Sequence, residues 1–201
     1  MEIYLIRHTA PQIEKGICYG QSDISLAETF PVDTQNILNH LPVRFDAVYS
    51  SPLSRCVKLA ELINSGQKFT HDKRLMEMNF GNWEMKKWDE INQRALNEWM
   101  QDFVNVRVPS GENFIDMNNR VNEFIDELLK GGFKKVALVT HAGVIRSVLC
   151  QILEIPLRNA FKIPIDYGSI TKINIEKKSC YQSIEYINQT LKLKPCELSQ
   201  N

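Results

Sequence analysis

The sequence lacks an excess of charge of either sign and contains no long hydrophobic run. Its 201 residues include 24 lysines and arginines against 24 aspartates and glutamates. Balanced charge excludes a global field that would attract nucleic acid or an anionic membrane, although a local anion site remains compatible with it. No segment approaches a membrane span, and no basic and apolar leader precedes the first strand-like run. We therefore expect a cytoplasmic enzyme or binding protein, with no nucleic acid and no membrane as partner.

Paired cysteine motifs and metal-ligand spacings are also absent. The five cysteines are odd in number, widely scattered and free of any Cys-x-x-Cys pair, so we expect reduced thiols. His40 and His71 fall at surface positions, and no cluster of His, Cys and carboxylates has usable ligand spacing, so neither a metal nor another cofactor is expected. The cysteines are Cys18, Cys56, Cys150, Cys180 and Cys196. The first three are expected to be structural residues.

The chain does contain a regular alternation of apolar runs and helical patterns. Strands are predicted at residues 2–6, 46–49, 68–70, 136–140, 170–175 and 181–187. Helices are predicted at residues 32–40, 53–64, 114–128 and 144–153, and along the apolar positions from Trp88 to Phe103. This alternation predicts an α/β fold, a three-layer α/β/α sandwich with a mainly parallel central sheet. We expect one domain over residues 1–188 and a polar tail at 189–201.

Local signals refine this outline. The segment from Ser110 to Asn113 is typical of a helix start, and Gly131 and Gly132 are typical of the end of the same helix. The tryptophans of the 88–103 pattern are expected in the core. Residues 7–30 show no sustained period and are predicted to form a long loop. Long loops in compact domains are often functional.

Polar side chains follow three of the predicted strands. Arg7 and His8 end the first strand, the segment from Ser50 to Arg55 follows the second, and His141 follows the strand at 136–140. The carboxyl ends of parallel strands share one rim, where α/β sheets usually bind ligands. We therefore expect these side chains to converge although they are far apart in sequence.

The converging residue types suit a phosphate group. Arginine presents a rigid fork of donors that matches phosphate oxygens. A neutral imidazole can attack phosphorus when an acceptor holds its second ring nitrogen, which makes His8 the candidate nucleophile. Arg7, Arg55 and His141 would offset the charge of the bound dianion and stabilise the oxygens during transfer.

Transfer from an alcohol also needs an acid that protonates the departing oxygen. Glu77 is the candidate, because it lies in a segment of carboxylates among apolar and aromatic residues. Glu84 in the same segment competes for this role. A solvated loop carboxylate is the alternative interpretation of Glu77.

Four sequence blocks resemble the histidine phosphatase superfamily, which has the phosphoglycerate mutase-like fold, in their order and approximate spacing. They are Arg7-His8-Thr9, Ser51-Pro52-x-x-Arg55, Leu75-x-Glu77-x-x-Phe80-Gly81-x-Trp83-Glu84 and Thr140-His141-x-Gly143-Val144-Ile145-Arg146, followed by Tyr167-Gly-Ser-Ile-Thr171 at the late strand. The resemblance implies that His8 becomes the phosphohistidine and Glu77 the proton donor. It also implies a phosphate pocket of Arg7, Arg55 and His141 that requires no metal.

The chain departs from the family pattern after the Arg-His pair. Thr9 stands where many members have Gly, and Glu14 lies where an Asn usually contacts phosphate, so Gln12, Gln21 or backbone amides would have to replace that contact.

The residues that follow resemble the α-ribazole phosphatase branch, which removes a 5′-phosphate during assembly of the cobalamin nucleotide loop. The pattern is Gly16-x-Cys18-Tyr19-Gly20-x-x-Asp23-x-x-Leu26. By this resemblance Tyr19, Gly20 and Ala142 join the substrate contacts. Tyr19 either stacks on a substrate ring or packs its loop against the domain.

Three alternatives stay open. A phosphoglycerate mutase would use the same pocket, but this chain is shorter than typical mutases, which favours hydrolysis. A broad-specificity phosphatase for sugars and other small phosphomonoesters is the second alternative. A non-catalytic phosphate-binding module is disfavoured because His8, Arg55, Glu77 and His141 are all present. The sequence predicts a small phosphomonoester as partner and makes no prediction of the oligomeric state.

Overall fold

The computed structural model describes residues 1–176 and 181–190, and within these ranges six strands form one central sheet. The strands are β1 (Glu2–Arg7), β2 (Ala47–Ser50), β3 (Thr70–His71), β4 (Lys135–Thr140), β5 (Ile170–Glu176) and β6 (Tyr181–Gln189). Their order in the sheet is β3-β2-β4-β1-β5-β6. The pairs β2–β3, β2–β4 and β1–β4 are parallel, whereas β5 is antiparallel to β1 and β6. The sheet is therefore mainly parallel, as predicted.

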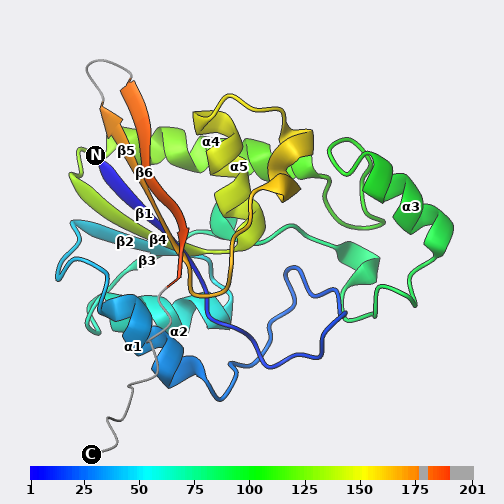
Figure 1. Ribbon diagram of the computed structural model, residues 1–201, viewed down its shortest axis with the longest axis horizontal. Coiled ribbons are helices and arrows are strands. Elements are labelled where there is room, and N and C mark those ends of the chain that lie inside the picture. The colour runs from blue at the N-terminus through cyan, green and yellow to red at the C-terminus, as the bar shows by residue number, and fades with distance from the viewer. Residues whose placement is uncertain (177–180, 191–201) are drawn as a thin grey trace, which may run out of the picture.

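Helices cover both faces of this sheet (Figure 1). They are α1 (Phe30–Leu38), α2 (Ser54–Ile63), α3 (Gln93–Gln101), α4 (Phe114–Lys130) and α5 (Ala142–Ile152), with short 3-10 turns η1 (Lys73–Leu75), η2 (Gly81–Trp83) and η3 (Leu157–Lys162). Alternate residues of a strand point to opposite faces. In β1, Ile3 and Leu5 join the apolar cluster of α4 and α5, whereas Tyr4 and Ile6 join that of α1 and α2. The predicted three-layer α/β/α sandwich is confirmed, with α3 at one end of the molecule.

The start of α4 follows its predicted signal. Asn113 accepts a hydrogen bond from the Asp116 N–H at 2.9 Å, and Asp116 accepts one from the Asn113 N–H at 3.2 Å. This capping box satisfies amides that would otherwise lack a partner at the helix start. At the other end Gly131 caps the helix, as predicted.

The helix expected along the Trp88 to Phe103 pattern is shorter than that pattern. It begins only after Asn92, whose side chain accepts a hydrogen bond from the Ala95 N–H at 3.1 Å. A side-chain cap of this kind ends the preceding turn and starts the helix, so Trp88 and Phe103 both lie outside α3. Trp99 is buried in the core as expected, whereas Trp88 packs against the core and is half-buried.

The long loop after β1 follows the prediction, whereas β6 includes Gln189, the first residue of the predicted tail. Within residues 8–29 the regular pairing consists of isolated bridges, one of them between Pro11 and Leu26. At the other end of the chain, Gln189 still pairs with Ile170 in β6. Residues 191–201, the rest of the predicted tail, lie outside the described residues.

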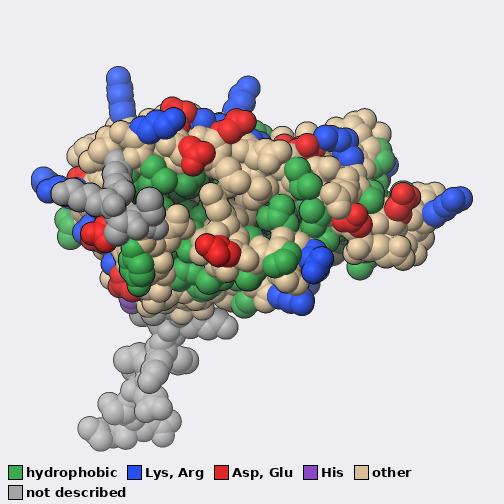
Figure 2. All heavy atoms as spheres, turned by 90° about the horizontal axis from the view of Figure 1, so that it is seen from above, with side chains coloured by type: hydrophobic (Ala, Val, Ile, Leu, Met, Phe, Trp, Pro, Cys, Tyr) green, Lys and Arg blue, Asp and Glu red, His purple; other side chains and the backbone are tan. Residues whose placement is uncertain are grey.

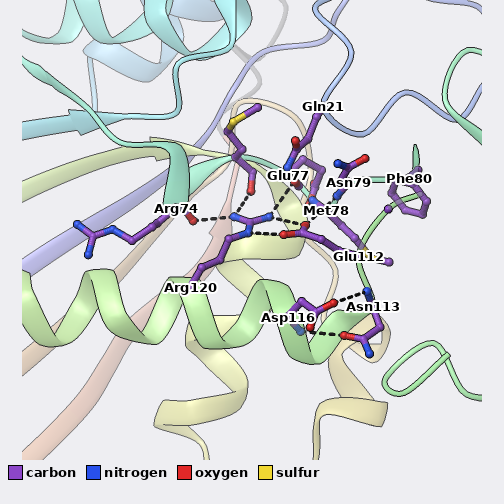
Figure 3. Close-up of polar contacts among 12 residues, drawn as sticks. Gln21, Arg74, Glu77, Met78, Asn79, Phe80, Glu112, Asn113, Asp116 and Arg120 are labelled. Carbon is purple, nitrogen blue, oxygen red and sulfur yellow. Dashed lines mark hydrogen bonds and ion pairs between the residues drawn. The ribbon is translucent and has the colours of Figure 1, made fainter. Parts of the chain in front are cut away.

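Arg120 of α4 anchors the irregular segment between β3 and α3, which carries Glu77 (Figure 3). Its guanidinium donates to the carbonyl oxygens of Arg74, Met76 and Glu77 at 2.7 to 2.9 Å. It also forms two hydrogen bonds with the Glu112 carboxylate, at 2.8 and 2.9 Å. One side chain therefore fixes the backbone of three positions around Glu77.

The surface agrees with the balanced composition. On the face seen in Figure 2, Lys and Arg side chains are interspersed with Asp and Glu rather than gathered in one basic area. None of the helices in the described ranges combines the length and the apolar character that a membrane crossing requires.

We predict that Arg120→Met lowers the free energy of unfolding by about 3 kcal/mol, because it removes the cation that pairs with the mostly buried Glu112 carboxylate and the donor to the carbonyl oxygens of Arg74 and Met76. The matched control is Arg107→Met, which removes an ion pair to Asp116 from a side chain that is 55% exposed. That loss is expected to stay below about 1 kcal/mol. Urea unfolding of both variants measures the difference, and equal losses would contradict the anchoring role.

Candidate active site

Strand register brings the two motif histidines together. Arg7 of β1 pairs with Thr140 of β4, so the residues that follow them, His8 and His141, leave the sheet side by side. Their ring centroids are 5.0 Å apart. Arg55, in the first turn of α2 after β2, approaches from the next strand, with its Nη2 3.5 Å from His141 Nδ1. The convergence expected from parallel strand ends is therefore present.

His8 is buried and held in one tautomer. Its Nδ1 lies 2.7 Å from the carbonyl oxygen of Thr9. A carbonyl can only accept, so we assign the proton to Nδ1, which leaves the lone pair on Nε2. Burial, reinforced by Arg55 and Arg7, holds the pKa of His8 well below 6.5. The ring is therefore neutral at neutral pH.

Arg55 and Arg7 carry charge without a carboxylate partner among the described residues. Arg55 is fully buried and donates to the carbonyl oxygens of Gly20 and Ser22 at 2.7 and 2.8 Å. Arg7 donates to the carbonyl oxygen of Ile165 at 2.5 Å. The Nε of each arginine is buried and has no hydrogen-bond partner. Buried charges are normally paired, so this arrangement favours an anion.

His141 is fully buried at the N-cap of α5. Its Nε2 lies 2.8 Å from the hydroxyl of Ser51 and 3.4 Å from the Cys56 sulfur. Burial is the main cause that lowers the pKa of His141 well below 6.5, and His8, Arg55 and Arg7 add to it. Ser51 begins the second sequence block, and the resemblance implies no role for it. Its position directly after β2 is the sequence signal that places it at the site.

The Glu77 carboxylate lies at the N-terminal end of α5. It accepts hydrogen bonds from the backbone N–H groups of Met78 at 2.9 Å and Gly143 at 3.1 Å. A Cβ on Gly143 would lie only 2.2 Å from Glu77 Oε1, so this approach requires glycine. Gln21 donates to the Glu77 carbonyl oxygen at 2.9 Å, and Gln12 is exposed.

The Glu84 carboxylate instead holds two loops together. Its oxygens accept hydrogen bonds from the N–H groups of Gln21 and Phe80 at 2.8 and 3.0 Å, and from the Ser22 hydroxyl at 2.5 Å. Gly20 has a φ of +35°, and a Cβ there would lie 2.5 Å from Glu84 Oε1. Both Glu84 oxygens are thus occupied by the fold.

Two tyrosines lie over the histidines and arginines. The hydroxyl groups of Tyr19 and Tyr167 are 2.5 Å apart. The guanidinium of Arg7 lies 3.7 Å from the Tyr167 ring centroid, and that of Arg55 lies 5.2 Å from the Tyr19 ring. Such contacts are favourable for a cation on an aromatic face. The ring centroids of Tyr167 and His8 are 5.5 Å apart, a proximity that no pattern in the sequence indicates.

A pocket of about 190 Å³ adjoins this cluster. Its walls include Tyr19, Gly20, Glu77, Gly143 and Arg146. Ala142, the first residue of α5, is buried and does not line this pocket.

The remaining candidates for chemistry are placed as expected. Cys18, Cys56 and Cys150 are buried free thiols, and burial raises the pKa of Cys18 and of Cys56 to about 12. Such thiols are poor nucleophiles. His40 and His71 are exposed. Within residues 1–176 and 181–190, no group of three or more His, Cys, Asp or Glu is arranged to hold a metal ion. Cys180 and Cys196 lie outside the described residues.

The chain is similar to known proteins in sequence and in fold. The chain is 29% identical over 194 residues to "Putative phosphoserine phosphatase 2" of Hydrogenobacter thermophilus, a match that covers 93% of this chain and 95% of the relative. It is 27% identical over 186 residues to the adenosylcobalamin/alpha-ribazole phosphatase of Escherichia coli K12, covering 89% and 92%. The crystal structure of the alpha-ribazole phosphatase from Shigella flexneri superposes with a TM-score of 0.86 at 25% identity, covering 96% of this chain and 100% of that one.

The family model of the histidine phosphatase superfamily (branch 1) matches residues 3–189. This range includes the whole central sheet except Glu2, and it includes every residue of the buried cluster. The chain therefore belongs to the histidine phosphatase superfamily.

Proposed function

We propose that the protein is a metal-independent phosphomonoesterase that acts through a phosphohistidine on His8. One observation carries this proposal: among the described residues, Arg7 and the fully buried Arg55 have no acid partner, and each has a buried Nε without a hydrogen bond, beside a neutral imidazole whose Nδ1 is held by a carbonyl oxygen. A phosphate dianion would supply the missing acceptors. A non-catalytic phosphate-binding module would not require the Nδ1–H tautomer that we assign to His8.

The reaction proceeds in two steps. In the first, Nε2 of His8 attacks phosphorus, the bond from phosphorus to the alcohol oxygen breaks, and Glu77 gives its proton to that oxygen. In the second, water attacks the phosphohistidine, the phosphorus–nitrogen bond breaks, and Glu77 takes the proton from water. Arg7, Arg55 and His141 hold the phosphoryl oxygens throughout. Glu77 is favoured over Glu84 as the acid because Glu77 lines the pocket beside the cluster, whereas Glu84 does not line it and holds two loops together.

We favour α-ribazole 5′-phosphate as the substrate. The Cys18-Tyr19-Gly20 pattern and the two alpha-ribazole phosphatases among the similar proteins support it. O-Phosphoserine is the second candidate, because the relative at 29% identity is named for that substrate. Transfer to a second hydroxyl, as in a mutase, would show exchange between bisphosphoglycerate and monophosphoglycerate without net phosphate release.

We predict that His8→Ala abolishes phosphate release and the trapping of a labelled phosphoryl group on the protein, because no other neutral imidazole of the cluster has its Nδ1 held by a carbonyl. The matched control is His71→Ala at an exposed position of β3, which is expected to leave both signals intact. Rapid acid quench with a labelled substrate measures them. Full turnover in His8→Ala would overturn the mechanism.

We predict that Glu77→Gln lowers kcat/KM for an alkyl phosphate by about 10²-fold to 10⁴-fold, because the alkoxide then leaves without a proton. An activated aryl phosphate needs little proton assistance, so its loss is expected to be much smaller. Glu84→Gln serves as the control and is expected to change both substrates by the same factor. A substrate ratio that responds to Glu84→Gln and not to Glu77→Gln would reverse the assignment.

We predict that His8 in the free protein is neutral at pH 6.5 and gains a proton only at lower pH. Burial and the two arginines disfavour the charged ring, so the folded pKa lies below that of the unfolded chain. Nitrogen chemical shifts of labelled histidine report both the charge and the tautomer, and the Nδ1–H form is expected. Half protonation of His8 at pH 6.5 would contradict the electrostatic account.

A further inference from the structure

A second hollow adjoins the pocket beside Glu77. It has a volume of about 610 Å³, and every side chain that lines it is apolar. Its walls are Phe80, Trp88, Leu96, Trp99, Met100, Phe103 and Phe161. Phe80, Trp88 and Phe161 also line the pocket of about 190 Å³, so the two hollows share a wall. Hydrophobic side chains are visible between the body of the molecule and its α3 end (Figure 2).

The smaller pocket leads from Glu77 to this apolar surface. Gly20 lines it and accepts a hydrogen bond from Arg55 through its carbonyl oxygen. Glu77 and Gly143 line the same pocket. The hydrogen bond from the Gly143 N–H to the Glu77 carboxylate fixes the position from which Glu77 delivers its proton. If Glu77 protonates the departing oxygen, the alcohol must extend from Glu77 into this pocket and away from His8.

The walls beyond Glu77 are unsuited to a small charged alcohol. Apart from Glu77, the single charged side chain that lines the smaller pocket is Arg146. Arg146 donates to the Ile163 carbonyl oxygen at 3.0 Å, and its guanidinium lies 5.0 Å from the Phe161 ring centroid. A small polar alcohol would leave most of these apolar walls uncovered and would gain little from them. A flat ring would gain stacking and edge contacts instead.

We propose that the two hollows together, which we call the leaving-group groove, bind an aromatic ring system carried by the alcohol of the substrate. Trp88, Phe80 and Phe161 are the residues that contact the ring. Arg146 supplies donors for hydroxyl groups between the ring and the phosphate. This inference rests on the proposed phosphatase activity and on the role of Glu77, and it names the class of alcohol: one with a ring several bonds from the esterified oxygen.

The aromatic contacts of the groove favour a preformed site. Trp88 stacks on Trp99 with a centroid separation of 6.3 Å, and Phe80 meets Trp88 edge to face at 5.7 Å. On the opposite wall, Phe161 meets Phe103 edge to face at 4.7 Å. Rings held by one another lose little further freedom when a ligand binds. Phe161 is nevertheless 47% exposed, which leaves one of its sides open to a ligand.

The test compares matched alkyl phosphates whose alcohols have similar acidity, 2-(1-naphthyl)ethyl phosphate and butyl phosphate, with α-ribazole 5′-phosphate and O-phosphoserine alongside. The wild-type protein is expected to prefer both ring-bearing esters in kcat/KM by at least about tenfold. Trp88→Leu and Phe161→Leu are expected to reduce this preference by about tenfold, mainly through the KM of the ring-bearing esters, because butyl phosphate loses fewer contacts with these side chains. The control is Phe69→Leu, which changes an aromatic residue outside the groove that stacks on exposed His71. This variant is expected to leave the preference unchanged.

The outcomes separate the groove from the reaction. If labelled phosphohistidine forms and butyl phosphate or O-phosphoserine is hydrolysed as well as the ring-bearing esters, the groove proposal fails and the proposed phosphatase stands. If no phosphomonoester is hydrolysed and no label is trapped on His8, the proposed function itself fails. A dimer in sedimentation experiments that Phe161→Leu dissociates, with ring preference unchanged, would assign the groove to a second copy of the chain and overturn the proposal. If Arg146→Met reduced the hydrolysis of carboxylate-bearing substrates alone, the result would point to O-phosphoserine as the substrate. That result would also overturn the groove proposal.

Discussion

Two arginines without an acid partner among the described residues, Arg55 fully buried and Arg7 with a buried Nε, are the constraint on which the site depends. Their guanidinium groups are satisfied in part by carbonyl oxygens of the loops around Gly20 and Ile165, so the same contacts that hold the charge also shape the loops. A carboxylate in place of these carbonyl oxygens would neutralise the arginines and exclude an anion from the site. Because the arginines also disfavour protonation of His8 and His141, one arrangement produces both anion affinity and a neutral nucleophile.

Glu77 is positioned from three sides rather than by its own helix or strand. Arg120 and Gln21 both donate hydrogen bonds to the backbone carbonyl oxygen of Glu77. The Gly143 N–H at the start of α5 donates a hydrogen bond to its carboxylate. Each of these partners comes from a different segment of the chain. The acid thus depends on tertiary packing, whereas the histidines depend on strand register.

This difference explains how far the sequence could be interpreted. Periodicity predicted the strands, and parallel order was enough to bring His8, Arg55 and His141 to one rim. The capping signal at Asn113 is local and was correct, but the helix along the Trp88 pattern was placed too long because Asn92 caps it internally. The contacts of Arg120 and Tyr167 join segments that are distant in the sequence, and at least one segment of each contact is irregular, so no pattern in the sequence could indicate them.

The two unpaired arginines have a further consequence for how the protein behaves in solution. A guanidinium presents a rigid fork of donors that matches oxyanions, so the two arginines attract any phosphate-like anion that reaches them. Inorganic phosphate would occupy the same donors as a substrate phosphoryl group. By mass action, any such anion stabilises the folded chain and competes for the site. Product inhibition and thermal protection by phosphate are therefore two expressions of the same unsatisfied charge.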